Sequence, residues 1–281
     1  MKHYNPITFC ISTYNNLPYL KIAIESVRTN SYFKDAPFVI HAENCTDGTN
    51  EWLLENNIKY DLQIHIQTNE IPLGIGGGMN FCAEQVQTEY IMFLHSDFYV
   101  SENWDINCLN IFNKYPDIPM WVFSYRIQPN IFNENSRPGT VIVPNELFGA
   151  YHDNFNHTEF LQYAKDFSNL NDIELDLGEG VSGLIRKRDW DAIGGNDPIF
   201  APTSWEDKDL FLRMVIANYK FVVTTKSVVW HFGARGSHRL EENNGKSAER
   251  QRQSEIKNVS NWLNKWGKLP VFNENGFIKN W

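Results

Sequence analysis

The regular part of the chain opens with ITFCISTYN at residues 7–15, an apolar and β-branched run that ends in four polar residues. Apolar residues then recur at helical spacing from Leu17 to Val27. A buried strand followed directly by an amphipathic helix is typical of a βαβ unit, in which successive strands run parallel. The opening residues therefore predict an α/β fold.

The same alternation continues through the first hundred residues. Further strands are expected at residues 38–42, 62–67 and 90–94, and a glycine-rich turn at 74–78 is expected to precede a helix over 79–86. Ligands of parallel α/β sheets bind beyond the carboxyl ends of the strands. Polar residues follow three such ends, at 12–15, 43–47 and 95–97. We expect these three segments to converge.

The second half has a looser pattern. Short strands are expected at residues 119–125, 181–185, 221–223 and 228–231, and helices are expected after Trp205 and over 246–266. The long terminal helix is amphipathic, with Ile256, Val259, Leu263 and Trp266 on one stripe. Its polar face mixes acidic and basic residues, which favours packing on the domain but leaves a dimer contact or a membrane-surface contact open.

Composition excludes several classes of protein. The 281 residues carry a net charge of −9, which argues against a nucleic-acid partner because such proteins need a basic surface. Apolar runs fall well short of the roughly 20 residues that cross a bilayer. The N-terminus lacks the apolar stretch of a secretory signal, so we expect a cytoplasmic location. The four cysteines form no Cys-x-x-Cys pair and are expected to be reduced thiols.

A candidate metal site lies at the end of the strand over 90–94. Asp97 stands two residues after His95, and His231 closes a later strand. A carboxylate with imidazoles suits Mn²⁺ better than Mg²⁺, which prefers oxygen ligands. The simpler interpretation is that Asp97 caps a helix and that His95 only ends the strand.

A second cluster, Trp205-Glu206-Asp207, stands at a helix start. A carboxylate there could accept a proton from a hydroxyl, and the indole could stack on a sugar ring. Adjacent acids in a first helical turn are also favoured by the helix dipole alone. Arg235, in the glycine-bearing loop at 233–239, could contact phosphate oxygens, although an ordinary basic surface loop has the same composition.

Taken in order, these motifs resemble family 2 glycosyltransferases with the GT-A fold, over residues 7–235. The matching segments are Ser12–Asn15, Glu43–Thr49, Gly77–Asn80, His95–Asp97, Gly183–Arg188, Gly194–Asp197, Glu206–Leu210 and Val229–His231. Two positions depart from the family pattern. Ala42 replaces the first acid of the usual Asp pair, and His95 replaces the first Asp of the Asp-x-Asp motif.

The resemblance implies a single Rossmann-like α/β domain over residues 1–240, with a central, mostly parallel mixed sheet flanked by helices. Residues 1–105 would form the nucleotide-sugar-binding half and residues 106–240 the acceptor-binding and catalytic half. Residues 241–281 would add a helical extension.

The resemblance also implies a metal-dependent, inverting transfer of a sugar, most simply from a UDP-sugar, to an acceptor hydroxyl. Asp207, with Glu206, would be catalytic, and Asp207 would act as the general base. Trp205 and Gly183 would bind the acceptor, and Asp97, His231 and His95 would hold Mn²⁺ or Mg²⁺. The nucleotide-sugar ligands would be Ser12, Thr13, Tyr14, Asn15, Glu43, Asp47, Gly78, Asn80, His95, Ser96, Asp97 and Arg235.

Two other hypotheses stay open at this stage. The acids missing at Ala42 and His95 would suit a domain that binds a sugar nucleotide or glycan with little or no turnover. His95, Asp97 and His231 also match the facial triad of non-haem Fe(II)/2-oxoglutarate oxygenases, although those enzymes are double-stranded β-helices. The acceptor is equally open among a glycan, a lipid-linked sugar and another hydroxyl compound.

Overall fold

A computed structural model of the protein describes residues 5–68, 71–131, 133, 135–177, 180, 182–233, 246–273 and 278–280. The strands are β1 (Ile7–Thr13), β2 (Phe38–Glu43), β3 (Leu62–Gln67), β4 (Tyr90–His95), β5 (Phe98–Val100), β6 (Met120–Pro129), β7 (Thr140–Val143), β8 (Glu174–Asp176), β9 (Gly183–Arg186), β10 (Lys220–His231), β11 (Val271–Phe272) and β12 (Ile278–Asn280). The helices are α1 (Leu17–Asn30), α2 (Thr49–Tyr60), α3 (Gly74–Gln85), α4 (Trp104–Lys114), α5 (His157–Leu170), α6 (Lys187–Ile193), the 3₁₀ helix η1 (Pro198–Phe200), α7 (Glu206–Ile216) and α8 (Lys246–Trp266).

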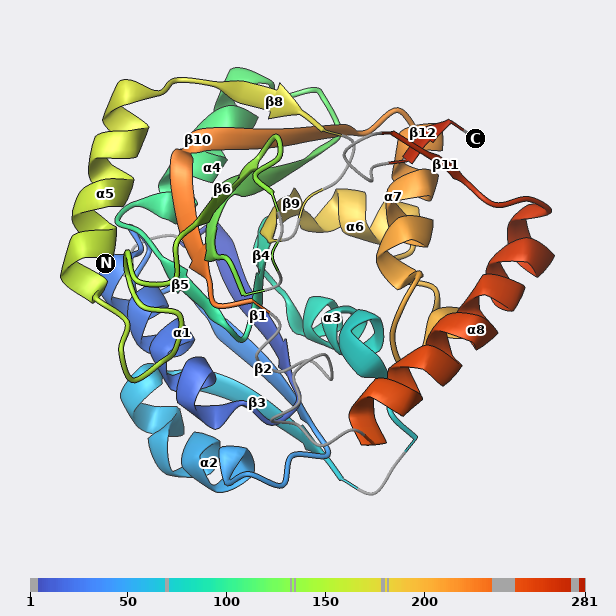
Figure 1. The fold of residues 1–281 in the computed structure, drawn as a ribbon, viewed down its shortest axis with the longest axis horizontal. Helices are drawn as coiled ribbons and strands as arrows, with labels where there is room; N and C mark the ends of the chain where they lie inside the picture. The colour runs from blue at the N-terminus through green and yellow to red at the C-terminus, as the bar shows by residue number, and fades with distance from the viewer. Residues whose placement is uncertain are drawn as a thin grey trace.

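One ten-stranded sheet runs through the molecule in the order β3-β2-β1-β4-β9-β6-β10-β5 (Figure 1). Strand β7 pairs with β6, and β8 pairs with β10. Strands β3, β2, β1 and β4 run parallel to one another. Strand β9 runs antiparallel to β4, and strands β5 and β8 run antiparallel to β10. The expected mixed, mostly parallel α/β sheet is confirmed.

The two faces of the sheet follow from side-chain alternation along β1. Ile7, Phe9 and Ile11 point toward a core formed with α1, α2 and α4, whereas Cys10 points toward α3, α6 and α7 on the other face. All four side chains are buried. Helices therefore cover both faces, as a parallel sheet requires.

The glycine-rich segment differs from its sequence prediction. It is the beginning of α3 and not a turn before it, because the helix starts at Gly74. A Cβ atom added at Gly78 would lie 2.0 Å from Ser12 Oγ and 2.9 Å from His41 Cδ2. Glycine at this position lets α3 lie directly on β1 and β2.

The two short strands expected at 221–223 and 228–231 are also corrected. They form one strand, β10, whose pairing with β6 shifts register between Thr224 and Val228. A bulge of this kind bends a strand without ending it. The bend brings His231 to the end of β5, where it pairs with Phe98.

Aromatic side chains fill a separate core under α5. The buried members include Tyr99, Phe155, Phe160, Trp230 and Phe232. Their rings pack in edge-on and tilted pairs with centroids 5.0–6.2 Å apart, which is favourable geometry for aromatic packing. Many of the aromatic residues, which make up 14% of the sequence, are thus core and not ligand surface.

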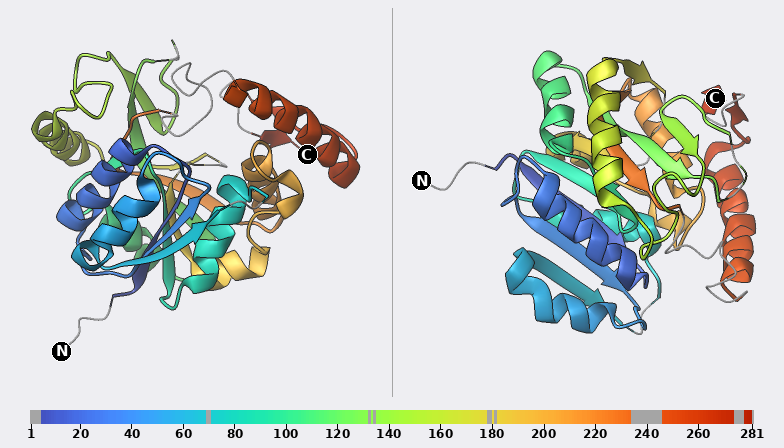
Figure 2. Two further views of the ribbon diagram at one scale, coloured as in Figure 1. Left: turned by 90° about the horizontal axis from the view of Figure 1, so that it is seen from below. Right: turned by 60° about the vertical axis from the view of Figure 1, so that its left-hand side comes forward.

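The terminal helix α8 lies along the α7 side of the molecule, apart from the sheet (Figures 1 and 2). It docks through the buried Trp262, which packs with Phe200 and Leu212. The helix therefore packs on the domain, as expected, but not through the predicted stripe, since Ile256 and Leu263 of that stripe are exposed, at 71% and 41%. No helix among the described residues is both long enough and apolar enough to cross a membrane.

Candidate active site

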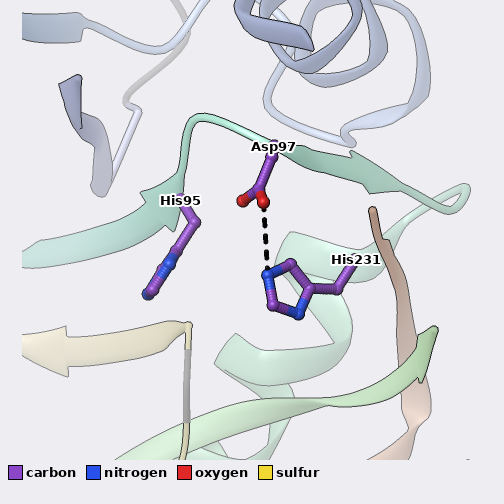
Figure 3. Close-up of side chains that lie close together, drawn as sticks. All are labelled: His95, Asp97 and His231. Carbon is purple, nitrogen blue, oxygen red and sulfur yellow. Dashed lines mark ion pairs between the residues drawn. The ribbon is translucent and has the colours of Figure 1, made fainter. Parts of the chain in front are cut away.

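The candidate metal site is assembled at the carboxyl end of β4. One donor atom from each of His95, Asp97 and His231 lies within 4.8 Å of the other two. His231 Nε2 is 3.4 Å from Asp97 Oδ2, and the two imidazole centroids are 6.0 Å apart (Figure 3). Asp97 is 5% exposed, so its charge needs a partner of opposite sign. The donor set therefore fits a divalent cation that accepts nitrogen ligands.

Neighbouring residues orient this cluster. Gln128 Oε1 lies 3.3 Å from His231 Nδ1, and an amide oxygen can only accept a hydrogen bond. A proton on Nδ1 leaves the lone pair of Nε2 directed at Asp97 and the candidate metal position, as is usual for metal-binding histidines. Phe98 supports both imidazoles, stacking on His95 and meeting His231 edge-on.

The simpler interpretation of Asp97 as a helix cap is wrong. The residue stands in the tight turn between β4 and β5 and precedes a strand. Its backbone carbonyl accepts from Phe232 N–H at 3.1 Å, which ties the turn to the end of β10. Local sheet geometry thus brings the three donor residues together.

The three polar segments at the strand ends do converge. Asn15 Oδ1 accepts from Thr46 N–H at 2.7 Å, which joins the first segment to the second. Asn16 Nδ2 donates to Ser96 Oγ at 3.1 Å, which joins the first to the third. In the sheet, Ser12 is paired with His95. The convergence predicted from strand alternation is confirmed.

Several predicted donor-binding side chains make contacts within the protein. Glu43 accepts from the N–H groups of Leu73 and Gly74 at the start of α3. Burial raises the pKa of this carboxyl group, and those hydrogen bonds partly offset the shift. Asp47 Oδ2 accepts from Leu17 N–H at 2.8 Å, so it caps the first turn of α1. These carboxylates stabilise the edge on which a ligand would sit.

Asn80 and Gly183 also have structural surroundings. Asn80 bridges α3 to the second half of the chain, because its Oδ1 accepts from Asn196 N–H and its Nδ2 donates to Asn196 O, both at 2.8 Å. Gly183 lies inside β9, between β4 and β6. A Cβ atom there would lie 2.2 Å from Val122 O, so close strand packing requires glycine.

The Trp205-Glu206-Asp207 cluster stands at the start of α7, as predicted. Asp207 is exposed, and its Oδ1 accepts from Lys208 N–H at 2.7 Å. Glu206 Oε2 is buried and has no hydrogen-bond partner among the described residues. Burial, with a smaller contribution from Asp207, raises the Glu206 pKa to about 8. The two acids are therefore in opposite environments. The Trp205 ring packs on Trp262 of α8, with centroids 5.1 Å apart.

A pocket opens beside the candidate metal site on the second half of the sheet. Phe98 and Val229 form its wall nearest His231, and its polar lining consists of Ser124, Arg126, Arg137, Thr140 and Ser182. Arg126 is 9% exposed and donates to Thr140 Oγ1. Arg126 and Gln128 are two residues apart in β6 and so share one face of the strand.

Sequence reasoning missed three contributors to this region: Asn16, Gln128 and the α8 residues that contact the segment before α7. Asn16 directly follows the polar run at 12–15, so its position was the available signal. Alternation in β6 could indicate that Gln128 shares a face with Arg126, but not that it contacts His231. Arg235 lies outside the described residues.

The structure agrees with the donor set of the oxygenase hypothesis but not with its fold. His95, Asp97 and His231 do come together, but the described strands form a helix-covered mixed sheet and not a double-stranded β-helix. The oxygenase hypothesis is therefore set aside.

The family model described as Glycosyl transferase family 2 matches residues 8–173. The structure of S. aureus TarS is similar, at 14% identity and a TM-score of 0.58, covering 82% of this chain and 37% of that chain. TarS 1-349 in complex with UDP is similar at 14% identity and a TM-score of 0.57, covering 80% and 60%. GalNAc-T7 with UDP, GalNAc and Mn²⁺ is similar at 12% identity and a TM-score of 0.59, covering 82% and 44%.

Because the sequence identities are only 12–14%, these similarities show a shared fold and nothing more. The chain also spans less than two thirds of each of these solved chains. No curated protein matches the chain in sequence.

Proposed function

The chain belongs to glycosyl transferase family 2, and from this premise we propose that it transfers a sugar from a nucleotide-sugar donor to an acceptor hydroxyl. The observation that carries the proposal is the His95, Asp97 and His231 cluster at the carboxyl ends of the sheet. A UDP-sugar is the proposed donor, because similar folds have been solved with UDP and with UDP-GlcNAc.

The proposed metal is Mn²⁺, held by His95, Asp97 and His231. A divalent cation supplies positive charge that offsets the diphosphate and its leaving charge. Two imidazoles and one carboxylate favour Mn²⁺ over Mg²⁺. The Mn²⁺ in the related fold of GalNAc-T7 supports the same choice. The net charge of −9 makes a cation between protein and diphosphate still more important.

We assign the donor to the edge formed by the three converging segments. Ser12, Thr13, Tyr14 and Asn15 would contact the nucleoside together with Ser96. Glu43, Asp47, Gly78 and Asn80 would act mainly by holding that edge, since each already serves a strand end or a helix. Arg235 is expected to add a phosphate contact. In this arrangement residues 1–105 bind the donor and residues 106–240 bind the acceptor.

The proposed base is Asp207, because the environments of the two adjacent acids separate their roles. With a pKa of about 8, Glu206 is mostly protonated at neutral pH and has little capacity to accept a proton. Asp207 is exposed and can reach an acceptor. The pocket lined by Arg126 and Ser182 lies on the acceptor half of the sheet. Trp205 is proposed to border the acceptor from the α8 side.

The proposed reaction is a single in-line displacement. The acceptor oxygen forms a bond to the anomeric carbon while the bond from that carbon to the diphosphate oxygen breaks. The bonding electron pair leaves with the nucleoside diphosphate, and the acceptor proton passes to the Asp207 carboxylate. One displacement inverts the anomeric configuration.

Thermal unfolding with a panel of nucleoside diphosphates and their sugars, with and without Mn²⁺, tests the donor side. A ligand that binds only the folded protein raises its stability by mass action, so the correct base and sugar should stand out. Phosphorus NMR of a reaction with the best donor would then show release of the nucleoside diphosphate. Binding without turnover, even with a panel of sugar acceptors, would favour a sugar-nucleotide-binding domain. No Mn²⁺-dependent binding at all would contradict the proposal.

A further inference from the structure

One buried side chain of α8 makes several of the bonds that hold the segment between η1 and α7. Asn258 is fully buried. Its Nδ2 lies 2.6 Å from Phe200 O, 2.8 Å from Thr203 O and 2.8 Å from Ser204 O. An amide nitrogen carries two hydrogens. Three carbonyls therefore share two donor hydrogens, so the backbone of the segment curves around the Asn258 amide.

Other α8 side chains contact the same backbone. Ser254 Oγ donates to Thr203 O at 2.6 Å, Lys257 Nζ to Ala201 O at 3.1 Å, and Asn261 Nδ2 to Ile199 O at 2.8 Å. Asn261 also donates to Asn258 Oδ1 at 3.0 Å, which fixes the orientation of the buried amide. The helix thus supplies donors to successive carbonyls along one loop.

The held segment ends in an unfavourable backbone conformation. Ser204 and Trp205 both have φ of 74°, in the left-handed region that residues with a Cβ rarely occupy. Such conformations persist only where the surroundings determine them, and they concentrate at functional sites. Glu206 and Asp207 follow immediately, so the direction of the first turn of α7 depends on this pair.

We propose that Asn258 is a positioning residue for Asp207. Its amide holds the carbonyls of Phe200, Thr203 and Ser204, these hold the left-handed pair, and the pair directs the carboxylate toward the acceptor. The inference rests on the proposed function, in which Asp207 is the base. It adds that the helical extension, which lies beyond the residues matched by the family model, completes the acceptor side of the site.

The test compares Asn258→Asp with Lys257→Ala. Aspartate has the size of asparagine but presents only acceptors to the three carbonyls. Asn258→Ser provides a small polar replacement if the aspartate variant does not fold. Lys257→Ala is the matched control, because it removes the one bond from this exposed side chain to Ala201 O and leaves both the Asn258 donors and the Asn261 bond to Asn258 in place.

The expected result is a split between binding and turnover. Asn258→Asp and Asn258→Ser should keep the Mn²⁺-dependent thermal shift with UDP and a donor KM within about twofold, whereas kcat should fall about 100-fold, as a misplaced group costs. Amide hydrogen exchange should accelerate over residues 203–209. Lys257→Ala should keep kcat within about threefold, since the Asn258 amide still orders the segment.

Three outcomes would overturn the inference. They are an unchanged kcat in folded Asn258 variants, an equal loss of kcat in the Lys257 control, and unchanged exchange over residues 203–209. If the wild-type protein shows no turnover, the proposed function fails instead. The exchange measurement then still decides whether Asn258 orders the segment.

Discussion

The two carboxylates proposed for the chemistry are held by different means. Asp97 stands in a tight turn between two adjacent strands, and its carbonyl bonds to Phe232 next to the strand that carries His231. Asp207 stands at the start of a helix, after two left-handed residues, and the carbonyls of Phe200, Thr203 and Ser204 before it accept from Asn258 of α8. Sheet pairing holds the first carboxylate, and we propose that side chains of the terminal helix orient the second.

The two carboxylates therefore depend on the sequence in different ways, one on local strand patterns and the other on contacts from a distant helix. Strand pairing delivers His95, Asp97 and His231 from short runs whose apolar pattern is visible locally. In the proposal above, positioning of Asp207 requires bonds from α8, a helix distant in sequence. Changes to the sheet side should therefore affect metal and donor, and changes to the α8 side should affect turnover or local stability.

The largest expected effects come from the carboxylates themselves. Asp97→Ala and Asp207→Asn should each lower turnover about 1,000-fold, because they remove the proposed metal ligand and the proposed base, respectively. Only Asp97→Ala should also abolish the Mn²⁺-dependent thermal shift with UDP. Steady-state turnover and thermal unfolding of both variants would check this. Full activity in both variants would refute the assigned roles. Loss of metal-dependent binding in both would mean that the sheet side and the α8 side do not have separate roles.

The next effect is on stability and concerns the link between α7 and α8. Asp209 is fully buried, with Oδ2 2.8 Å from Arg213 Nε and Oδ1 2.7 Å from Lys265 Nζ. Trp266 Nε1 also donates to Oδ1, at 2.9 Å. Removing one member of a buried charge network is strongly destabilising. Asp209→Ala should lower the unfolding free energy by about 3 kcal/mol in urea titrations.

The matched control is Lys114→Ala, which removes an ion pair to Glu174 from a side chain that is 57% exposed. Exposed pairs contribute less than about 1 kcal/mol. Equal losses in the two variants would mean that α8 docking adds little to the stability of the domain.

A smaller effect is expected at Gln128, on the sheet side. Gln128→Leu removes the acceptor at His231 Nδ1 and should weaken Mn²⁺ binding about 10- to 100-fold, as loss of a supporting hydrogen bond does at metal sites. Gln128→Glu, which keeps an acceptor, is the control and should retain affinity. Titration of Mn²⁺ by calorimetry in the presence of UDP gives both values. Unchanged affinity in the leucine variant would show that sheet pairing alone orients His231.

The last effect is graded over several pH units and concerns the pH dependence of stability at Glu206. Burial raises its pKa from 4.5 to about 8, so the folded protein binds a proton that the unfolded chain releases. This contribution to stability is complete below about pH 4.5 and is lost as the pH rises through about 8. Glu206→Gln cannot lose that proton, so its advantage over wild type should grow by up to about 1.4 kcal/mol per pH unit between pH 5 and 8. Parallel urea-stability profiles of the two proteins would contradict this.

Much of the fold is visible in the sequence because strand signals are local. The strand predicted at 62–67 is β3 to the residue, and the convergence of three strand ends follows from parallel pairing. The metal cluster was predictable as a set because each member ends or follows a strand.

The rest depends on contacts between distant segments. At the start of α3, the N–H groups of Leu73 and Gly74 donate to the distant Glu43, a contact that no periodicity reveals. The continuity of β10 depends on a register shift against β6. Asn258 is an ordinary polar residue in an amphipathic helix until its three carbonyl partners are known.

The bonds from α8 to the segment before α7, which we call the α8 clamp, have a consequence for which sequence changes this segment tolerates. Ser254, Lys257, Asn258 and Asn261 all bond to main-chain carbonyls, and every residue type offers such a carbonyl. The side chains at Ala201 and Thr203 can therefore be exchanged without removing a single bond of the clamp. Sequence changes at these two positions should therefore leave the course of the backbone before α7 unchanged.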